Sequence, residues 1–592
     1  MRRRRLGILS RGLGAMVVGL STGTLAYGQT AASPALLNQV PQVSPIPHIL
    51  PKAPPNLGQS LPNFQPLGQE GAVPHAAVPV RSAAVIGATA FPAAVLTHTI
   101  GRLVGPAVPL ASIEAARLRL VSLYRNHGYV LTAVSAEINA GGDLRFIVTE
   151  GHIVTVKLSR DIGPVGSLVL DFLDHLTREG PVREASLEHW LLLAEEIPGV
   201  SITAVLQRND AAPGALTLIA QVRHQIVSGL LTADNRGFRE TGPAEGLAVA
   251  DVNSVTALGD QTQISLFHTS GSTNNFGQAA ESFFVGARGL RIGIYAGAGR
   301  SQPSGVLREI GYKAYLEVFG INATYPLLLR RGDTLAAKLS LDGTQNLIDS
   351  ASGIGGGEMA TSSDSVRAIR FELNEAFTDD ALGGDRVALT TASLLLSKGV
   401  SILGASANGR TNGGRVGETF TFFKLDGAIE RTQTLFSPFA GATVALQGAL
   451  GGQYTPNVLP SSEEFYLGGN RITQGYYSGE VTGDKALYAS AEVQLNTPVD
   501  FTAFGREINL GTQVYGFYDY GENWQNDKLL PGETHNNYRL ASAGIGARVR
   551  LTATLEFDIE GVHRFVTRLQ PVNSGVPPLS GTAVYWGVLA RY

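Results

Sequence analysis

Few residues of this 592-residue chain have the types and spacing that catalysis or metal binding requires. The chain has no cysteine, and none of its 11 histidines stands in a His-Glu-x-x-His arrangement. The P-loop of nucleotide-binding proteins is absent, and no Gly-x-Ser-x-Gly elbow lies in the strand-to-helix setting that hydrolases need. We therefore expect no catalytic residues, no metal site, no cofactor and no enzymatic function.

The composition indicates a β-rich protein rather than a helical one. Glycine occurs 71 times, charged residues make up 16% and hydrophobic residues 44%, yet no long apolar run follows the N-terminus. A bundle of transmembrane helices is thereby excluded, because each would need about 20 apolar residues in a row. A membrane β-barrel explains the mixture, and a soluble glycine-rich β-protein is the alternative. The net charge of −3 gives no reason to expect nucleic acid as a partner.

From residue 226 to 592 apolar and polar residues alternate, which is the pattern of strands with one apolar face. The clearest segments are 335–342, 369–374, 487–495 and 551–560. Because helices to cover such a sheet are missing, we expect a closed barrel with lipid outside and a polar lumen. Over 508–520 the apolar residues share one phase and Asp519 takes the other, so Asp519 should face the lumen. The terminal aromatic Tyr592 and the lack of a fixed repeat argue against a β-helix or propeller.

Residues 82–225 show a soluble α+β pattern, divided into two units at 82–152 and 153–225. The first has a helix over 113–123 that ends before Gly128, and a strand over 144–148. The second is expected to have a strand over 154–158, helices over 168–176 and 187–194 and a strand over 216–222, with Ser186 as the N-cap of the second helix.

The N-terminus has the features of an exported protein. Arg2 to Arg5 precede an apolar stretch over 13–25, and small residues precede a cleavage point after Gly28, so residues 1–28 are predicted to be a signal peptide. Residues 29–81 are rich in proline and are expected to form a tether, which could hold a short plug helix around 35–40.

Several motifs together resemble the transporters of two-partner secretion, the hemolysin activation/secretion group of the Omp85 superfamily. The first set of motifs resembles the two POTRA domains of that family, at Gly128, Tyr129, Glu150, Gly151, Pro198 and Gly199. The second set resembles its barrel entry, at Asp234, Asn235, Gly237, Gly242, Gly259 and Asp260. The resemblance implies a barrel of 16 antiparallel strands in the bacterial outer membrane, preceded by two periplasmic POTRA domains.

The most informative motif resembles the long loop that folds back into the barrel in this superfamily. Its residues are Gly468, Gly469, Arg471, Gln474, Gly475 and Tyr476. By the same resemblance, the barrel-wall partners of the loop are Phe517, Asp519 and Gly521. Gln474 stands where the family has an arginine that meets the acidic wall residue, and glutamine offers only a neutral hydrogen bond. We therefore expect either a more loosely held loop or a charge supplied by Arg471.

The resemblance implies a transporter that binds an unfolded secreted polypeptide, expected to be large and β-helical, through its POTRA domains and passes it through the barrel. Without a nucleotide site, folding of the cargo outside the cell would drive export. Outer-membrane lipid is the other expected partner. The alternatives are an outer-membrane insertase, which usually has more POTRA units, and a passive pore or adhesin.

Overall fold

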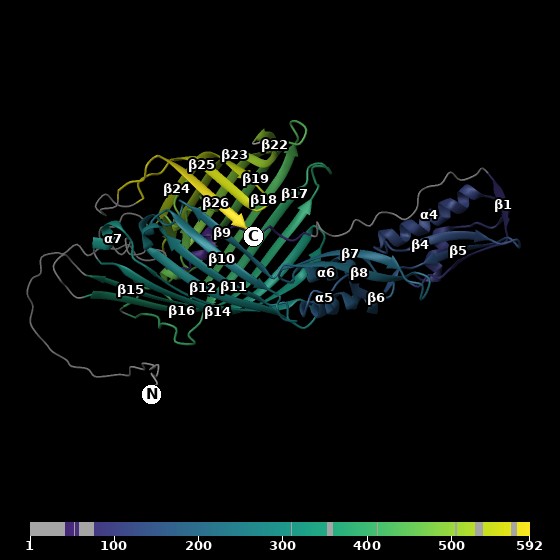
Figure 1. Ribbon diagram of the computed structural model, residues 1–592, viewed down its shortest axis with the longest axis horizontal. Coiled ribbons are helices and arrows are strands. Elements are labelled where there is room, and N and C mark those ends of the chain that lie inside the picture. Colours follow the sequence, from purple (N-terminus) through teal and green to yellow (C-terminus); the bar gives the residue numbers. More distant parts are fainter. Residues whose placement is uncertain are drawn as a thin grey trace, which may run out of the picture.

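The structure is a computed structural model with a β-barrel and an elongated arm of two α+β units (Figure 1). It describes residues 42–52, 54–57, 76–309, 311–351, 359–410, 412–503, 506–526, 537–569 and 577–592. The predicted signal peptide and the helix expected around 35–40 lie outside these residues. Within the described residues, no helix is long and apolar enough to cross a membrane.

The barrel is a single closed sheet in which each strand pairs antiparallel with its neighbours, and β26 pairs with β9 to close it. Its strands are β9 (Val227–Asp234), β10 (Glu245–Asn253), β11 (Gln261–Thr269), β12 (Asn274–Val285), β13 (Leu290–Ser301), β14 (Lys313–Arg330), β15 (Asp333–Ala351), β16 (Met359–Asp379), β17 (Ala388–Gly399), β18 (Phe423–Phe436), β19 (Thr443–Tyr454), β22 (Lys485–Ala503), β23 (Arg506–Trp524), β24 (Asn537–Arg550), β25 (Leu555–Arg564) and β26 (Thr582–Arg591). The expected barrel of 16 antiparallel strands is confirmed.

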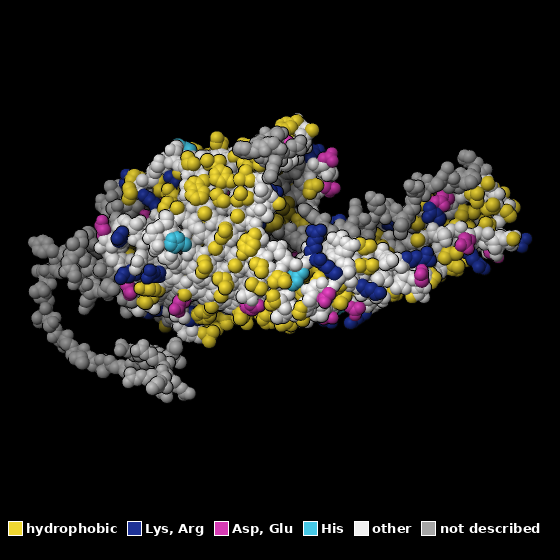
Figure 2. Space-filling view, in the orientation of Figure 1, with side chains coloured by type: hydrophobic (Ala, Val, Ile, Leu, Met, Phe, Trp, Pro, Cys, Tyr) yellow, Lys and Arg dark blue, Asp and Glu magenta, His cyan; other side chains and the backbone are white. Residues whose placement is uncertain are grey.

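The alternation in the sequence separates an apolar outer face from a polar lumen. Val493 on β22 is 54% exposed, whereas its neighbour Glu492 is 3% exposed and faces inward. Hydrophobic side chains form a band over the barrel strands (Figure 2). The strand expected over 551–560 begins only at Leu555, because residues 552–554 form the turn after β24.

The first α+β unit, at the end of the arm, packs two helices against short strands. Its elements are β1 (Ala77–Val80), β2 (Ser82–Ile86), α3 (Ala93–Ile100), β3 (Gly105–Pro109), α4 (Leu110–Asn126), β4 (Ala133–Ile138) and β5 (Asp143–Thr149). Helix α4 buries Leu120 and Tyr124 against Leu144 and Phe146 of β5. Val80 belongs to the same core, so this unit begins before residue 82.

The second unit lies between the first unit and the barrel. It contains β6 (His152–Leu158), α5 (Val165–Leu173), the 3-10 helix η1 (Asp174–Arg178), α6 (Glu184–Glu195), β7 (Val200–Arg208) and β8 (Ala215–His224). The N-cap expected at Ser186 is wrong, because α6 is capped at Arg183 and Ser186 lies in its first turn. In β6 a register shift between Ile153 and Thr155 buries Ile153 and leaves Val154 38% exposed, whereas Val156 and Leu158 pack against the core as expected.

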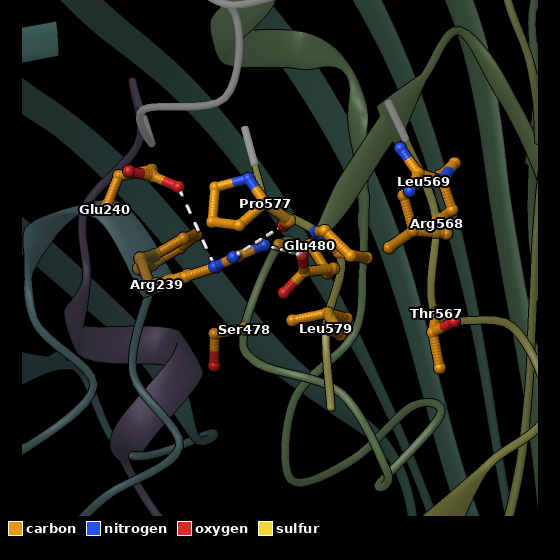
Figure 3. Close-up of a pocket in the computed structure, with 12 residues that line it drawn as sticks. Arg239, Glu240, Ser478, Glu480, Thr567, Arg568, Leu569, Pro577 and Leu579 are labelled. Carbon is orange, nitrogen blue, oxygen red and sulfur yellow. Dashed lines mark hydrogen bonds and ion pairs between the residues drawn. The ribbon is translucent and has the colours of Figure 1, made fainter. Parts of the chain in front are cut away.

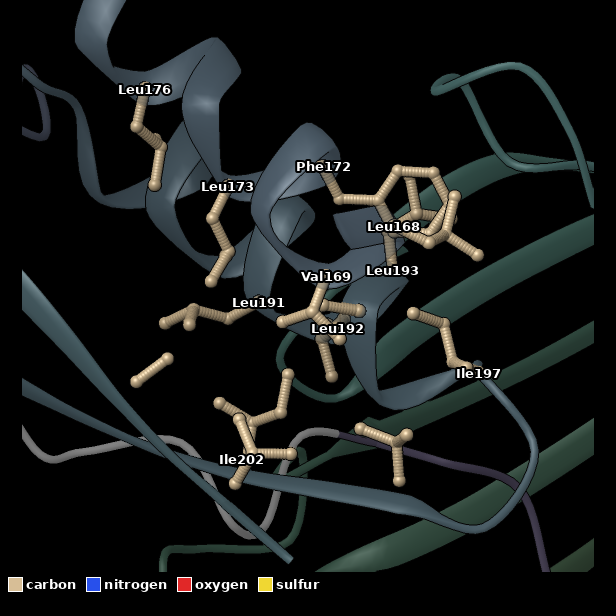
Figure 4. Close-up of a cluster of buried hydrophobic side chains, with 14 of the residues drawn as sticks. Leu168, Val169, Phe172, Leu173, Leu176, Leu191, Leu192, Leu193, Ile197 and Ile202 are labelled. Atoms are coloured by element: carbon tan, nitrogen blue, oxygen red, sulfur yellow. The ribbon is translucent and has the colours of Figure 1, made fainter. Parts of the chain in front are cut away.

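The hydrophobic core of the second unit continues into the barrel. The rim of the barrel on which this unit packs is here called the near rim, and the opposite rim is called the far rim. Phe172 of α5 packs edge to face against Phe284, which lies near the end of β12, with 5.6 Å between the ring centroids. Leu168, Phe172 and Leu193 lie close to the barrel strands (Figure 4). Arg331 of the β14–β15 turn pairs with Glu188 of α6 at 3.1 Å. The second unit is therefore held against the barrel by both apolar packing and charge.

Candidate functional site

The connection between β19 and β22 leaves the far rim and returns into the lumen. It contains the 3-10 helix η4 (Ser461–Glu463) and two short paired strands, β20 (Phe465–Leu467) and β21 (Val481–Gly483). Residues 468–480 between these strands form a loop, here called the lumen loop. Gly468 and Gly469 open it with φ angles of 111° and 120°, which side chains rarely tolerate. The two glycines therefore allow the sharp turn that sends the chain inward.

The tip of the lumen loop is fixed to the wall through its backbone. The Gln474 N–H donates to Asp519 Oδ2 at 2.6 Å, and the Gly475 N–H donates to Ser542 Oγ at 3.2 Å. The Tyr476 hydroxyl lies 2.8 Å from the Ala541 carbonyl oxygen and 2.9 Å from the Val566 carbonyl oxygen, and its one proton is shared between these two acceptors. Asp519 and Tyr476 are both fully buried. The structure thus brings Gln474, Gly475, Tyr476 and Asp519 together.

The other two expected wall residues lie on the same face of β23 as Asp519. Gly521 leaves room for the loop, because a Cβ there would lie 2.8 Å from Leu467 Cδ1. Phe517 is buried below it and packs with Tyr515. Gly521 is therefore in contact with the loop region, whereas Phe517 belongs to the wall beneath the tip.

Cations near the tip come from β25 and from the β9–β10 connection rather than from the loop. The Arg564 guanidinium donates from Nε to the Gly475 carbonyl at 2.6 Å and from Nη2 to the Tyr585 hydroxyl at 2.6 Å. Arg236 pairs with Glu560 at 2.9 Å and stacks 4.2 Å from the centroid of the Tyr585 ring. Arg564 and Tyr585 could not be singled out from the sequence, because nothing in their local pattern separates them from other lumen residues.

The expectation that Arg471 supplies a charge to Asp519 is wrong. Arg471 Nη2 donates instead to the carbonyl oxygen of Leu50, in the segment that precedes the first α+β unit. The contact of Asp519 with the loop is made by the Gln474 backbone N–H, which any residue except proline could provide.

A pair of variants separates these contributions. Gln474→Ala is expected to leave protease protection of the lumen loop unchanged, because it keeps the backbone N–H. Asp519→Asn is expected to expose the loop, because it replaces a charged acceptor worth about 1.5–3 kcal/mol with a neutral one. Limited proteolysis of the full-length protein in detergent measures both. Increased cleavage in Gln474→Ala alone would mean that the side chain anchors the loop.

Residues 42–52 and 54–57 run through the lumen from the far side of the lumen loop to the near rim. The Gln42 N–H donates to the Tyr466 hydroxyl at 3.2 Å, and the Leu57 carbonyl accepts from Gly332 of the β14–β15 turn at 2.9 Å. Between them a short helix, α2 (Ile46–Ile49), buries Ile46 and Ile49 against lumen residues of β10, β11 and β12. The described residues 42–52 and 54–57, called the lumen segment below, therefore fill part of the pore.

The lumen segment also contacts the wall through charge. Lys52 Nζ lies 3.3 Å from Glu430 Oε2 and donates to Thr391 at 3.1 Å. Beside it a cavity of about 830 Å³ reaches Gln474 at the loop tip, and a second of about 450 Å³ borders Asn56 near the second unit. The space left around the segment is thus lined by both polar and apolar residues.

At the far rim, a small pocket joins the base of the lumen loop to two outer connections (Figure 3). Arg239, in the 3-10 helix η2 (Arg239–Thr241), lies 3.7 Å from Glu480 and donates to the Pro577 carbonyl at 2.9 Å. The Ser478 N–H donates to the carbonyl oxygen of Arg236 at 2.9 Å. The part of the lumen loop that follows its tip, residues 478–480, is therefore bound to the β9–β10 connection.

The residues expected at the barrel entry lie on opposite rims. Asp234, Asn235, Gly237 and Gly242 lie at or just beyond the far ends of β9 and β10. Asn235 bridges the closing seam by donating to Val584 O at 3.0 Å and accepting from the Trp586 N–H at 2.8 Å.

Gly259 and Asp260 lie in the near-rim turn between β10 and β11. A Cβ on Gly259 would meet Leu168 of the second unit at 2.7 Å. This part of the motif therefore serves the docking of the second unit onto the barrel, not the lumen loop.

Five of the six residues that resemble POTRA motifs, all except Glu150, lie at the joints of the arm. Gly128 and Gly151 accept from Glu184 N–H at 2.8 Å and Val182 N–H at 3.0 Å, and the Tyr129 hydroxyl accepts from Arg183. These contacts join the two units.

The joint between the second unit and the barrel is made in the same way. The Pro198 carbonyl accepts from Ser254 Oγ at 2.7 Å, and the Gly199 carbonyl accepts from the Gln225 N–H at 2.8 Å. A Cβ on Gly199, whose φ is 72°, would lie 2.3 Å from the Gln225 carbonyl, so glycine is required there.

Glu150 is the buried carboxylate at the centre of the first unit. It accepts from the N–H groups of Thr89 at 2.8 Å and Ala90 at 2.9 Å, and from the Tyr124 hydroxyl at 2.6 Å. Burial raises the pKa of Glu150, but the hydrogen bonds from Thr89, Tyr124 and Ala90 outweigh it and hold the pKa below its ordinary value of 4.5.

Glu150→Gln is expected to lower the free energy of unfolding of the first unit by about 1–3 kcal/mol at neutral pH. Because the folded pKa is lowered, ionised Glu150 stabilises the fold fully above pH 4.5, and this stabilisation is lost as the pH falls through the folded pKa. Thermal unfolding of the full-length protein, followed by protease cleavage within residues 76–149, should show the gap to wild type closing in acid. Glu137→Gln, at an exposed position of β4, is the control. A gap that does not change with pH would contradict the assignment.

Comparisons with known proteins agree with this architecture. The profile of the ShlB-type POTRA domain matches residues 78–151. The heme/hemopexin transporter protein HuxB of Haemophilus influenzae (strain 86-028NP) is 19% identical over 455 residues, which cover 76% of this chain and 77% of HuxB.

Two solved structures have the same fold. CdiB from Escherichia coli superposes with a TM-score of 0.65 at 14% identity, over 89% of this chain and 92% of that one. CdiB from Acinetobacter baumannii superposes with a TM-score of 0.59 at 15% identity, over 90% and 94%. The profile of the haemolysin secretion/activation proteins ShlB/FhaC/HecB matches residues 217–549, more than half of the chain. The chain therefore belongs to the haemolysin secretion/activation family of outer-membrane two-partner secretion transporters, with its POTRA units in the periplasm.

Proposed function

We propose that this transporter binds an unfolded secreted polypeptide through its two α+β units and passes it through the barrel lumen without ATP. The observation that carries the proposal is that the lumen already holds a polypeptide. Beyond α2, residues 50–57 have no regular secondary structure where they are described, and they lie along the pore between the lumen loop and the near rim. A lumen that accepts this segment has the width and polarity to accept another chain in its place.

The arm offers surfaces on which an unfolded chain can add by backbone hydrogen bonding. In the sheet of the first unit the order is β2-β5-β4, and in the second it is β6-β8-β7, so β2, β4, β6 and β7 are edge strands. An extended polypeptide can extend such an edge with little regard to its side chains. Val205 on β7 and Ile138 on β4 are 41% and 38% exposed and would favour an apolar cargo segment.

The energy for export would come from the cargo. The sequence has no P-loop, and a chain that folds outside the cell is removed from the population that can slide back. The outward apolar side chains of the strands, such as Val493, would contact outer-membrane lipid.

Deletion of the gene, followed by comparison of surface and culture-medium proteins, tests the proposal. The expected result is that one large secreted protein disappears from outside and accumulates or is degraded in the periplasm, while other barrels assemble normally. Failure of many barrels together would indicate an insertase instead. No change in either would favour a passive pore or adhesin.

A further inference from the structure

The far end of the lumen is narrowed by the second half of the connection between β17 and β18. Residues 412–422, here called the outer connection, turn inward, and Phe420 and Phe422 are buried with Val366 and Ala368 of β16 and with Leu459. The Thr419 N–H donates to the Val458 carbonyl at 2.8 Å. Val366 and Ala368 share a strand face with Arg370, whose partner Glu463 lies in the lumen-loop connection. The outer connection therefore fills the lumen beside β16. It also packs on the segment around Leu459 that precedes the lumen loop, here called the base of the loop together with Asp484, which follows the loop.

Arg415 of the outer connection lies at the centre of a buried charge cluster. Its guanidinium donates to Asp484 at 2.8 and 3.1 Å and to the Leu459 carbonyl at 2.6 Å, and it lies 3.4 Å from Glu464. The Arg415 side chain is 2% exposed, and those of Asp484 and Glu464 are 0% exposed. One side chain thus ties the outer connection to both ends of the lumen loop, since Leu459 and Glu464 precede it and Asp484 follows it.

The other contacts of Asp484 complete the cluster. Asp484 also accepts from the N–H groups of Leu459 and Asn526, each at 2.7 Å. Arg415 donates to Gln525 as well, so the β23–β24 connection joins the same cluster. Removing one member of a buried ion pair leaves the other charge without compensation, which makes such clusters difficult to open. The base of the lumen loop is therefore fastened by ion pairs between side chains, whereas at its tip the wall side chains of Asp519, Ser542 and Arg564 bond to backbone atoms of the loop.

We propose that Arg415 is a positioning residue that narrows the far mouth of the pore, by holding the outer connection against the base of the lumen loop. The pore then has two barriers in series, the lumen segment and the outer connection. An exported chain has to displace both, and the second opens only when the contacts of Arg415 with Asp484 break. The inference rests on the proposed function, but gating of the pore can be measured without any cargo.

The test is the ion conductance of the otherwise full-length protein in planar lipid bilayers, in the wild-type background and in one that lacks residues 42–57. Arg415→Met keeps the length of the side chain and removes its charge. In the deletion background it is expected to raise the conductance to at least double that of the deletion alone, with Arg415→Lys in between. Val416→Ala, at the neighbouring exposed position, is the matched control and should have no effect. A folded Arg415→Met barrel with the conductance of the deletion alone would overturn the proposal.

A second variant keeps Arg415 in place, in case its substitution prevents folding. Because the chain has no cysteine, the pair Thr419→Cys and Val458→Cys introduces a single disulfide between the outer connection and the base of the loop. The oxidised form is expected to block secretion, and a reductant should restore it. Secretion at the wild-type rate with the disulfide formed would contradict the proposal. The two proposals can fail separately. If the gene deletion reveals no secreted partner while the Arg415 variants still change the conductance, the proposed export function is wrong, but the role of Arg415 in narrowing the pore is supported.

Discussion

Deletion of residues 42–57 is expected to raise the ion conductance of the purified protein severalfold and to remove most of its closed time. The lumen segment packs Ile46 and Ile49 on the wall, pairs Lys52 with Glu430 and accepts a hydrogen bond from Arg471. Without it, these lumen residues would face water, and the cavity of about 830 Å³ beside the loop tip would join the space that the segment occupied. Single-channel recording in planar bilayers measures the change.

Pro54→Ala is the control for this deletion, because Pro54 is exposed within the same segment. It should leave the conductance at the wild-type value. A deletion variant that is folded and yet conducts like the wild type would mean that the outer connection alone closes the pore.

Gly475→Ala is expected to dislodge the tip of the lumen loop and to reduce secretion by roughly tenfold. A Cβ at this position would lie 2.3 Å from Ser542 Cβ and 2.6 Å from its Oγ, much closer than atoms can approach. Overpacking of this kind costs about 1–3 kcal/mol. The same displacement would separate the Gly475 carbonyl from Arg564. Protease accessibility of the loop and the amount of secreted partner measure the two effects.

The steric explanation has two direct checks. Gly561→Ala on β25 should have no effect, because nothing lies within 4 Å of the Cβ it would add. Ser542→Gly combined with Gly475→Ala removes the clash and should restore much of the secretion. If the double variant is as defective as Gly475→Ala alone, the loss has a cause other than crowding against Ser542.

The barrel and the arm could be predicted because their signals are local. Alternation with a period of two, as at 487–495, needs only the near neighbours of each residue to show which face it takes. The helical spacing of Ile113, Ala116 and Leu120 is equally local and gave the right helix. The errors occur where backbone geometry departs from the regular pattern, as in the register shift between Ile153 and Thr155.

The start of α6 was misplaced for a related reason. Ser186 has a side chain suited to capping, but the helix begins at Glu184 and is capped at Arg183 without a side-chain hydrogen bond. Glu184 donates its N–H to Gly128 of the first unit, so a contact between units accompanies the earlier start. A propensity rule cannot include that contact.

The alternation in the sequence determined which face of each strand lines the lumen, including that of Asp519, and the resemblance to the family singled out residues 468–476. Only the tertiary structure decided their partners: Arg471 meets Leu50 across 421 residues, Arg564 meets Gly475 across 89, and Arg415 meets Asp484 across 69. The physical reason is that closure of the barrel and the return of one connection into it bring distant segments together. The pattern of apolar and polar residues fixes which face each side chain takes, but not which of the many polar lumen residues it pairs with.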